Sequence, residues 1–268
     1  MIPRIPLRPG QVAVLTSALV AALTGSACST SRAESDVGAP DTTTSTASAV
    51  RPSRLYIVGV DVSGSLTPTR RQEGRDLVNS LVGQLTFGDR LTIVETYRSR
   101  SDSAGQWTDD APMARNANAP SGNEKRRLAQ FQQRARMMAE GFFEPDPARP
   151  VLSTDILALL QRASDYAHSA RDRRTTLLLV SDMLNATHTL NMEKAGGIPD
   201  AGWVADAKSQ GRLPDLKGVC VVVAGADVSS PRGIAAREFW RRYLTASGAE
   251  FDPARYRTLI ADAADVGC

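Results

Sequence analysis

The sequence contains few of the residues that bind zinc. Two histidines and three cysteines occur among its 268 residues, and no two cysteines have the spacing of a CxxC knuckle. The isolated His168 and His188 cannot supply the three or four clustered nitrogen and sulfur ligands that a zinc site requires. Zinc-dependent chemistry is therefore not expected.

Blocks of basic residues with interleaved aromatic residues are also missing. The net charge is +3, but the first 27 residues contain two arginines and no acid, so removing them leaves +1. The basic runs at 125–127 and 171–174 are typical of solvated helix faces or helix ends. The high isoelectric point is thus no argument for nucleic acid, and we expect no nucleic-acid partner.

Common catalytic motifs are absent as well. Neither a P-loop nor a G-x-S-x-G nucleophile elbow occurs, and no His–acid pair stands out in the sequence as a candidate general base. We therefore predict a protein that is not an enzyme. A metal-dependent hydrolase remains the alternative.

The first 27 residues resemble a processing segment. Arg4 and Arg8 precede an apolar stretch at 11–23 that is too short to span a bilayer comfortably. The small residues before Cys28 resemble a bacterial lipoprotein cleavage site, which implies that Cys28 carries lipid. Ordinary cleavage after Ala27, giving a secreted protein, and a retained membrane anchor are the alternatives. All three place the protein outside the cytoplasm, in the cell envelope or beyond it.

Residues 28–53 are expected to form a disordered tether. They are rich in Ser, Thr, Ala, Asp, Gly and Pro and show no hydrophobic periodicity. A flexible chain of about 25 residues has a root-mean-square reach of roughly 25–30 Å. One domain, residues 54–268, follows.

The domain is organised around an apolar run that ends in polar residues. Leu55 to Val60 reads as a strand buried on both faces, and Asp61, Ser63 and Ser65 follow it. Ligands of open α/β sheets bind at the carboxyl ends of the strands. One carboxylate and two hydroxyls suit Mg²⁺, Mn²⁺ or Ca²⁺.

Two later segments complete a recognisable pattern. Thr154 stands before an apolar-periodic helix, and Asp182 follows a second buried strand at 175–181. Together with the first polar segment, these positions resemble the von Willebrand factor A (vWA) domain and its metal-ion-dependent adhesion site over residues 53–262. The resemblance assigns the metal ligands as Asp61, Ser63, Ser65, Thr154 and Asp182.

The resemblance implies a Rossmann-like vWA fold, in the α/β class: a doubly wound, mainly parallel sheet flanked by helices, with strand order 3-2-1-4-5-6. It also implies a binding module whose cation takes a carboxylate from a protein partner. The pattern predicts strands at 55–60, 90–97, 106–113, 175–181, 219–224 and 256–260. It predicts helices from about 67 to 85, 123–141, 154–170, 201–209 and 231–247.

Simpler interpretations remain open. Asp and Ser at a strand end are common turn formers, and Thr154 or Ser153 could cap the helix that follows. Asp61 resembles the nucleophile of haloacid dehalogenases, but Ser63 stands where those enzymes have a second Asp. A module that has lost its metal is a third reading. We expect Asp61 to lie at the rim, so that Asp61→Ala abolishes metal binding while the fold survives.

If Cys28 carries lipid, Cys220 and Cys268 are the two cysteines left to form a disulfide. An oxidising compartment permits a disulfide between them. Cys220 lies in an apolar run, however, and is equally compatible with a small buried strand residue.

Overall fold

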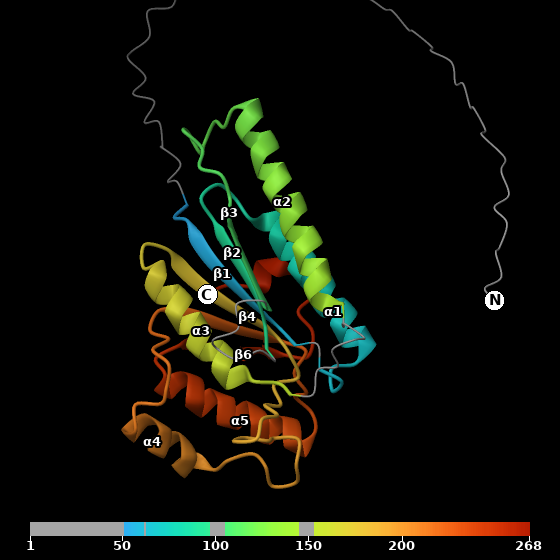
Figure 1. The fold of residues 1–268 in the computed structure, drawn as a ribbon, viewed down its shortest axis with the longest axis vertical. Coiled ribbons are helices and arrows are strands. Elements are labelled where there is room, and N and C mark those ends of the chain that lie inside the picture. The colour runs from blue at the N-terminus through green and yellow to red at the C-terminus, as the bar shows by residue number, and fades with distance from the viewer. Residues whose placement is uncertain (1–50, 62, 97–104, 145–152) are drawn as a thin grey trace, which may run out of the picture. The chain divides into compact units, whose positions relative to one another are not determined.

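A mainly parallel sheet forms the centre of the domain (Figure 1). The computed structural model describes residues 51–61, 63–96, 105–144 and 153–268. The predicted signal peptide, Cys28 and nearly all of the tether lie outside these residues. The strands are β1 (Arg54–Val60), β2 (Arg90–Glu95), β3 (Gln106–Asp110), β4 (Arg174–Val180), β5 (Val219–Ala224) and β6 (Glu250–Arg257). The helices are α1 (Pro68–Gln84), α2 (Gly122–Phe143), α3 (Ile156–Ser169), α4 (Ala201–Ser209), α5 (Pro231–Ala246) and the short 3-10 helix η2 (Ala263–Asp265).

The strand order is β3-β2-β1-β4-β5-β6, and only β3 pairs antiparallel. The predicted α/β class and strand order are therefore confirmed. The chain leaves β1 toward β2 and leaves β4 toward β5, so the neighbours β1 and β4 flank the point where the winding reverses. Loops at the carboxyl ends of two such strands open a crevice between them.

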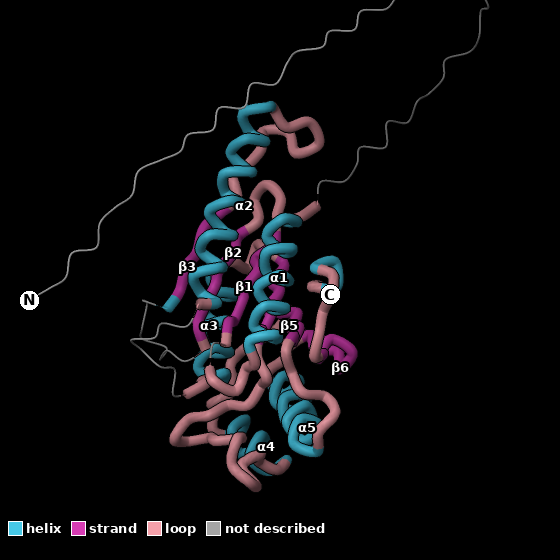
Figure 2. The backbone as a smooth tube through the Cα atoms, turned by 90° about the vertical axis from the view of Figure 1, so that its right-hand side faces the viewer, coloured by secondary structure: helices cyan, strands magenta, loops and turns pink. Residues whose placement is uncertain are grey.

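Helices cover both faces of the sheet. In Figures 1 and 2, α1 and α2 lie side by side over one face, and α4 lies beside α5 over the other. Side chains of α1 and α2 bury Val58 and Val60, whereas α3 and α5 bury Leu55 and Ile57. Burial on both faces explains why β1 and β4 read as continuous apolar runs. Gly59 is required for this packing, since a Cβ there would lie 2.5 Å from a methyl carbon of Leu159.

Several predicted boundaries shift. Thr67 caps α1 as expected, accepting from the Arg70 amide at 3.3 Å, with Pro68 in the first turn. The predicted strand at 256–260 is wrong in extent, because β6 runs from Glu250 to Arg257. The first half of β6 gives no strand signal in the sequence, because its residues are largely exposed and polar and include a proline at position 253. The edge strand β3 ends at Asp110 rather than at 113, and residue 97 lies outside the described part of the chain.

No helix in the described ranges is long and apolar enough to cross a membrane.

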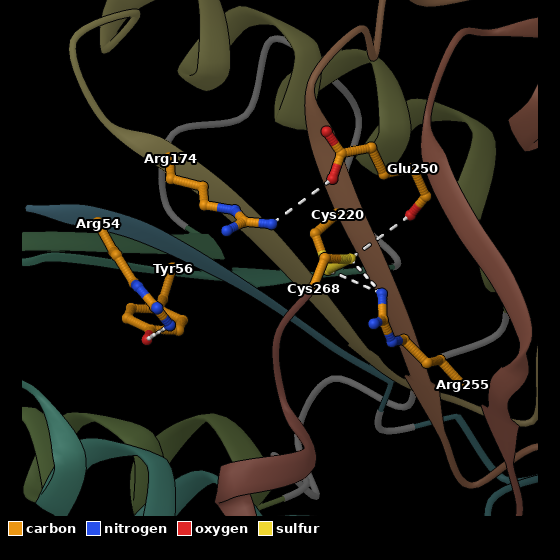
Figure 3. The surroundings of a disulfide bond; sticks show 7 residues. All are labelled: Arg54, Tyr56, Arg174, Cys220, Glu250, Arg255 and Cys268. Atoms are coloured by element: carbon orange, nitrogen blue, oxygen red, sulfur yellow. Dashed lines mark hydrogen bonds and ion pairs between the residues drawn. A yellow bond between two sulfur atoms is a disulfide. The ribbon is translucent and has the colours of Figure 1, made fainter. Parts of the chain in front are cut away.

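A disulfide joins Cys220 of β5 to Cys268 (Figure 3). Their Cα atoms are 5.8 Å apart, and 48 positions separate them in the sequence. The Arg255 guanidinium donates toward both sulfur atoms, and Cys220 is 1% exposed. The bond fixes the last residue of this sequence beside the amino ends of β4 and β5.

We expect Cys268→Ser to lower the free energy of unfolding by about 2–4 kcal/mol, because the disulfide limits the freedom of the unfolded chain. Urea unfolding of the oxidised parent and of the variant measures this difference. Under reducing conditions the two proteins should become equally stable. Two free thiols in the mass spectrum of the non-reduced parent would contradict the pairing.

Candidate metal centre

Asp61 is held in place by donors from three segments. Its side chain is completely buried. Oδ1 accepts from the Ser63 amide at 2.9 Å and from the Thr154 hydroxyl at 3.3 Å, and Oδ2 accepts from the Ser181 hydroxyl at 2.7 Å. The expected rim position is therefore wrong: the loops after β1 and β4 cover the carboxylate. Replacement by alanine would leave these donors unpaired, so the milder Asp61→Asn is the better probe.

Ser63 and Ser65 point their hydroxyls at one another. The two oxygens are 2.9 Å apart, Ser63 is buried and Ser65 is exposed. Ser65 also hydrogen-bonds to Asp182, which links the loop after β1 to the loop after β4. The Ser65 hydroxyl thus contacts both Asp182 and the Ser63 hydroxyl, whereas Ser63 binds Asp61 through its backbone amide.

Thr154 faces Asp61 because another residue caps the helix. The Asp155 carboxylate accepts from the Ala158 amide at 3.0 Å, so neither Ser153 nor Thr154 is the N-cap of α3. Thr154 bridges to Ala186, which donates its amide to the Thr154 carbonyl at 2.8 Å. Its fully buried side chain is thereby left to bind Asp61.

Asp182 is a buried acid close to another acid. It is 7% exposed, and its Oδ1 accepts from the Leu184 amide at 2.9 Å. Burial raises the pKa of Asp182 above its usual range, and the nearby charges of Asp61 and Glu193 act in the same direction. The hydrogen bonds from Ser65 and Leu184 oppose this shift in pKa without cancelling it.

The structure thus brings the five predicted ligands together, and their chemistry fits a hard divalent cation. Two carboxylates and three hydroxyls supply oxygen only. Within the described residues, neither Asp61 nor Asp182 forms an ion pair with a basic side chain. Two buried acids without a basic partner are costly unless a cation or a proton offsets their charge. The same residues include no group of three or more His, Cys, Asp or Glu suited to a metal, so any cation here depends on the hydroxyls.

A cavity of about 520 Å³ leads to these residues. Three of the predicted ligands, Ser63, Ser65 and Thr154, line it, and Glu193 and Arg232 contribute one charge of each sign. Both charged residues are exposed, whereas Asp61 and Asp182 are buried and are not among the residues that line the cavity.

Two supporting residues were missed in the sequence. Ser181 binds Asp61, and Asn185 is fully buried with its Oδ1 accepting from the amides of Ile156 and Leu157 at 2.9 and 3.3 Å. Asn185 thereby ties the loop after β4 to the start of α3. The only sequence signal was their position within three residues of Asp182.

The structure also contains a histidine–acid pair that sequence spacing did not reveal. His168 Nε2 lies 3.2 Å from Asp215 Oδ2, with Ser164 Oγ 3.4 Å from His168 Nδ1. The arrangement does not activate a serine, because Ser164 Oγ donates to the Asp215 carbonyl at 2.8 Å and His168 Nδ1 lies 2.7 Å from the Ser164 carbonyl. Both ring nitrogens face acceptors, so neither is left to take a proton from a nucleophile. The pair lines a separate cavity of about 380 Å³ at the amino ends of β4 and β5.

No family model matches the chain, and no curated protein matches it either. Solved structures do resemble it. The von Willebrand factor type A protein of Catenulispora acidiphila is 13% identical, with 76% of this chain and 40% of that chain covered and a TM-score of 0.40. The manganese-loaded TRAP protein of Plasmodium vivax is 11% identical, with 80% and 70% covered and a TM-score of 0.36.

Proximal thread matrix protein 1 of the mussel byssus is 17% identical, with 65% of this chain covered and a TM-score of 0.33. The present chain spans only 38% of that protein's length. Membrane-associated and pilus-adhesin proteins are among the other similar structures. At such identities and TM-scores, none of these similarities says what this chain binds.

We expect Ser181→Ala to lower the free energy of unfolding of the metal-free protein by about 1–3 kcal/mol, because a buried carboxylate loses a donor. Urea unfolding in the presence of chelator measures the loss. Ser164→Ala is the matched control, since its buried hydroxyl donates to a neutral carbonyl and should cost about 1 kcal/mol. A smaller loss at Ser181 than at Ser164 would contradict the role given to Ser181.

Proposed function

We propose that the protein is an extracytoplasmic, lipid-anchored binding module that uses a divalent cation to bind an acidic residue of a protein partner. Asp61, Ser63, Ser65, Thr154 and Asp182 hold the ion, which is Mg²⁺, Mn²⁺ or Ca²⁺. The observation that carries the proposal is the pair of buried carboxylates, Asp61 and Asp182, which accept from hydroxyls and form no ion pair with a basic residue in the described part of the chain.

The donor set explains why a carboxylate should be the ligand. The two carboxylates balance the charge of a divalent ion and the other three donors are neutral hydroxyls, so five donors leave at least one of its six or more coordination positions for a further oxygen anion. Arg232 lines the same cavity and adds a cation for an incoming acid. The partner group is thus recognised by its charge and by its reach into the cavity.

The position of the site suits an anchored protein. The chain enters the domain at Arg54, at the amino end of β1, whereas Asp61 follows the carboxyl end of that strand. Seven residues at about 3.3 Å each separate these ends by roughly 23 Å. The polypeptide therefore enters the domain at the edge of the sheet opposite to the site.

A hydrolase is not proposed, because no observation favours it. The histidine–acid pair at His168 and Asp215 lies at the opposite edge of the sheet from Asp61, and its hydrogen bonds are structural.

We expect Mg²⁺ to bind the parent protein and Asp61→Asn to weaken that binding by at least about 100-fold. Loss of a charged ligand should exceed the roughly 10–100-fold effect of losing an outer hydrogen-bond partner. Calorimetric titration measures both affinities, with circular dichroism to confirm that each variant is folded.

Glu193→Gln is the charge-matched control for this titration. It removes one negative charge from the same cavity without removing a predicted ligand, so its effect should be small. Equal Mg²⁺ affinity in the parent and in Asp61→Asn would show that the ion does not bind at this site. Equal losses of Mg²⁺ affinity in Asp61→Asn and Glu193→Gln would show that the change of charge, and not the loss of a ligand, weakens binding.

The anchor is tested separately from the site. We expect Cys28→Ala to move the protein from the membrane fraction to the soluble envelope fraction, because the thiol that accepts the lipid is gone. Cell fractionation followed by immunoblotting measures the distribution. A variant that stays with the membranes would contradict lipidation at Cys28.

A further inference from the structure

Met183, the residue after Asp182, has a backbone conformation that side chains rarely adopt. Its φ is 64°, and it is the only non-glycine residue with positive φ in the described ranges. Its side chain is fully buried. A left-handed conformation is unfavourable for a residue with a Cβ and persists only where surrounding contacts enforce it. Something in the structure must hold Met183 in this state.

Trp240 supplies that contact. Its indole Nε1 donates to the Met183 carbonyl at 2.8 Å, from the middle of α5 and across 57 positions of sequence. Trp240 is fully buried, and its ring makes edge contacts with Phe239 and Tyr243, with centroids 5.0 and 5.7 Å apart. The indole is therefore fixed in orientation before it meets the loop. No other hydrogen bond to the Met183 carbonyl occurs among the described residues.

The Met183 backbone is bonded directly to the residues that support the metal ligands. Its amide donates to Ser181 Oγ at 2.9 Å, and the same hydroxyl donates to Asp61 Oδ2 at 2.7 Å. On the other side of Met183, the Leu184 amide donates to Asp182 Oδ1 at 2.9 Å. If Met183 relaxed to a negative φ, both of these amides would turn away from their acceptors. Asp182 would then lose a hydrogen bond, and the Ser181 hydroxyl that donates to Asp61 would lose the amide that orients it.

We infer that Trp240 is a positioning residue for the metal site. Its indole N–H binds the Met183 carbonyl rather than a predicted ligand, and it acts by holding Met183 in the left-handed conformation that aims Asp61 and Asp182. The inference rests on the proposed function for its effect on metal affinity, whereas its effect on the Met183 backbone is independent of any ion.

The first experiment removes the indole N–H and keeps an aromatic ring. Trp240→Phe should weaken Mg²⁺ binding about tenfold, the factor that corresponds to 1.4 kcal/mol. Phe239→Leu is the matched control, because it trims the neighbouring buried aromatic residue of α5 without removing a hydrogen bond to the loop. Calorimetric titration should show that Phe239→Leu leaves Mg²⁺ affinity within about twofold of the parent, a difference below 0.5 kcal/mol.

The second experiment is a rescue at Met183 itself. Glycine adopts positive φ without penalty, so Trp240→Phe should lose its effect on Mg²⁺ affinity when combined with Met183→Gly. Met183→Ala removes the same thioether chain but keeps the Cβ, so Trp240→Phe should remain harmful in that background. Rescue by glycine and not by alanine would separate a backbone role from a packing role. Equal behaviour of the two backgrounds would overturn the inference.

The third experiment keeps this inference distinct from the proposed function. Urea unfolding in chelator should show that Trp240→Phe destabilises the Met183→Ala protein more than the Met183→Gly protein. No ion is involved, so this comparison decides the role of Trp240 even if the parent fails to bind Mg²⁺. Absence of Mg²⁺ binding by the parent would overturn the proposed function alone. Equal destabilisation in the two backgrounds would overturn the role of Trp240.

Discussion

Two negative charges buried near each other at the end of a sheet are the constraint on which the rest of this site depends. Asp61 and Asp182 are 0% and 7% exposed, and the neighbouring charge of Asp61 helps to raise the pKa of Asp182. Hydrogen bonds offset part of the cost, but hydroxyls and amides cannot neutralise two charges. The proposed divalent cation would neutralise them, which would explain why polar groups of several segments converge on these two residues.

The parallel sheet makes this convergence possible. Asp61 and Ser181 are 120 positions apart, yet β1 and β4 are neighbours in register, so their carboxyl ends meet. Asn185 and Asp155 then fix the start of α3, which leaves Thr154 free to face Asp61. Trp240 of α5 donates to the Met183 carbonyl in the loop directly after Asp182. Asp61, Thr154 and Asp182 thus each contact a residue outside the predicted ligand set, whereas Ser63 and Ser65 contact one another.

How much of this could be predicted differs between residues. The sequence predicts β1 and β4 and the acids that follow them, because burial on both faces of the sheet leaves a continuous apolar run. The burial of Asp61 could not be predicted, since it depends on how the loops after β1 and β4 pack around it. Trp240 and Met183 are 57 positions apart, and no local sequence pattern predicts a hydrogen bond between an indole and a backbone carbonyl. The first half of β6 was missed because its exposed polar residues give no hydrophobic period. The family resemblance supplied the pairing of Asp61 with Asp182, which periodicity alone could not.

Crystals grown with Mn²⁺ and measured at the manganese absorption edge test the central claim most directly. The account predicts one anomalous peak within about 2.0–2.6 Å of oxygens from the loops after β1 and β4, the range expected for hard cations. The peak should lie at the base of the cavity lined by Ser63, Ser65 and Thr154 and should be absent in Asp61→Asn crystals. A fully occupied ion elsewhere with none between Asp61 and Asp182, or a protonated pair bonded directly to each other, would contradict it.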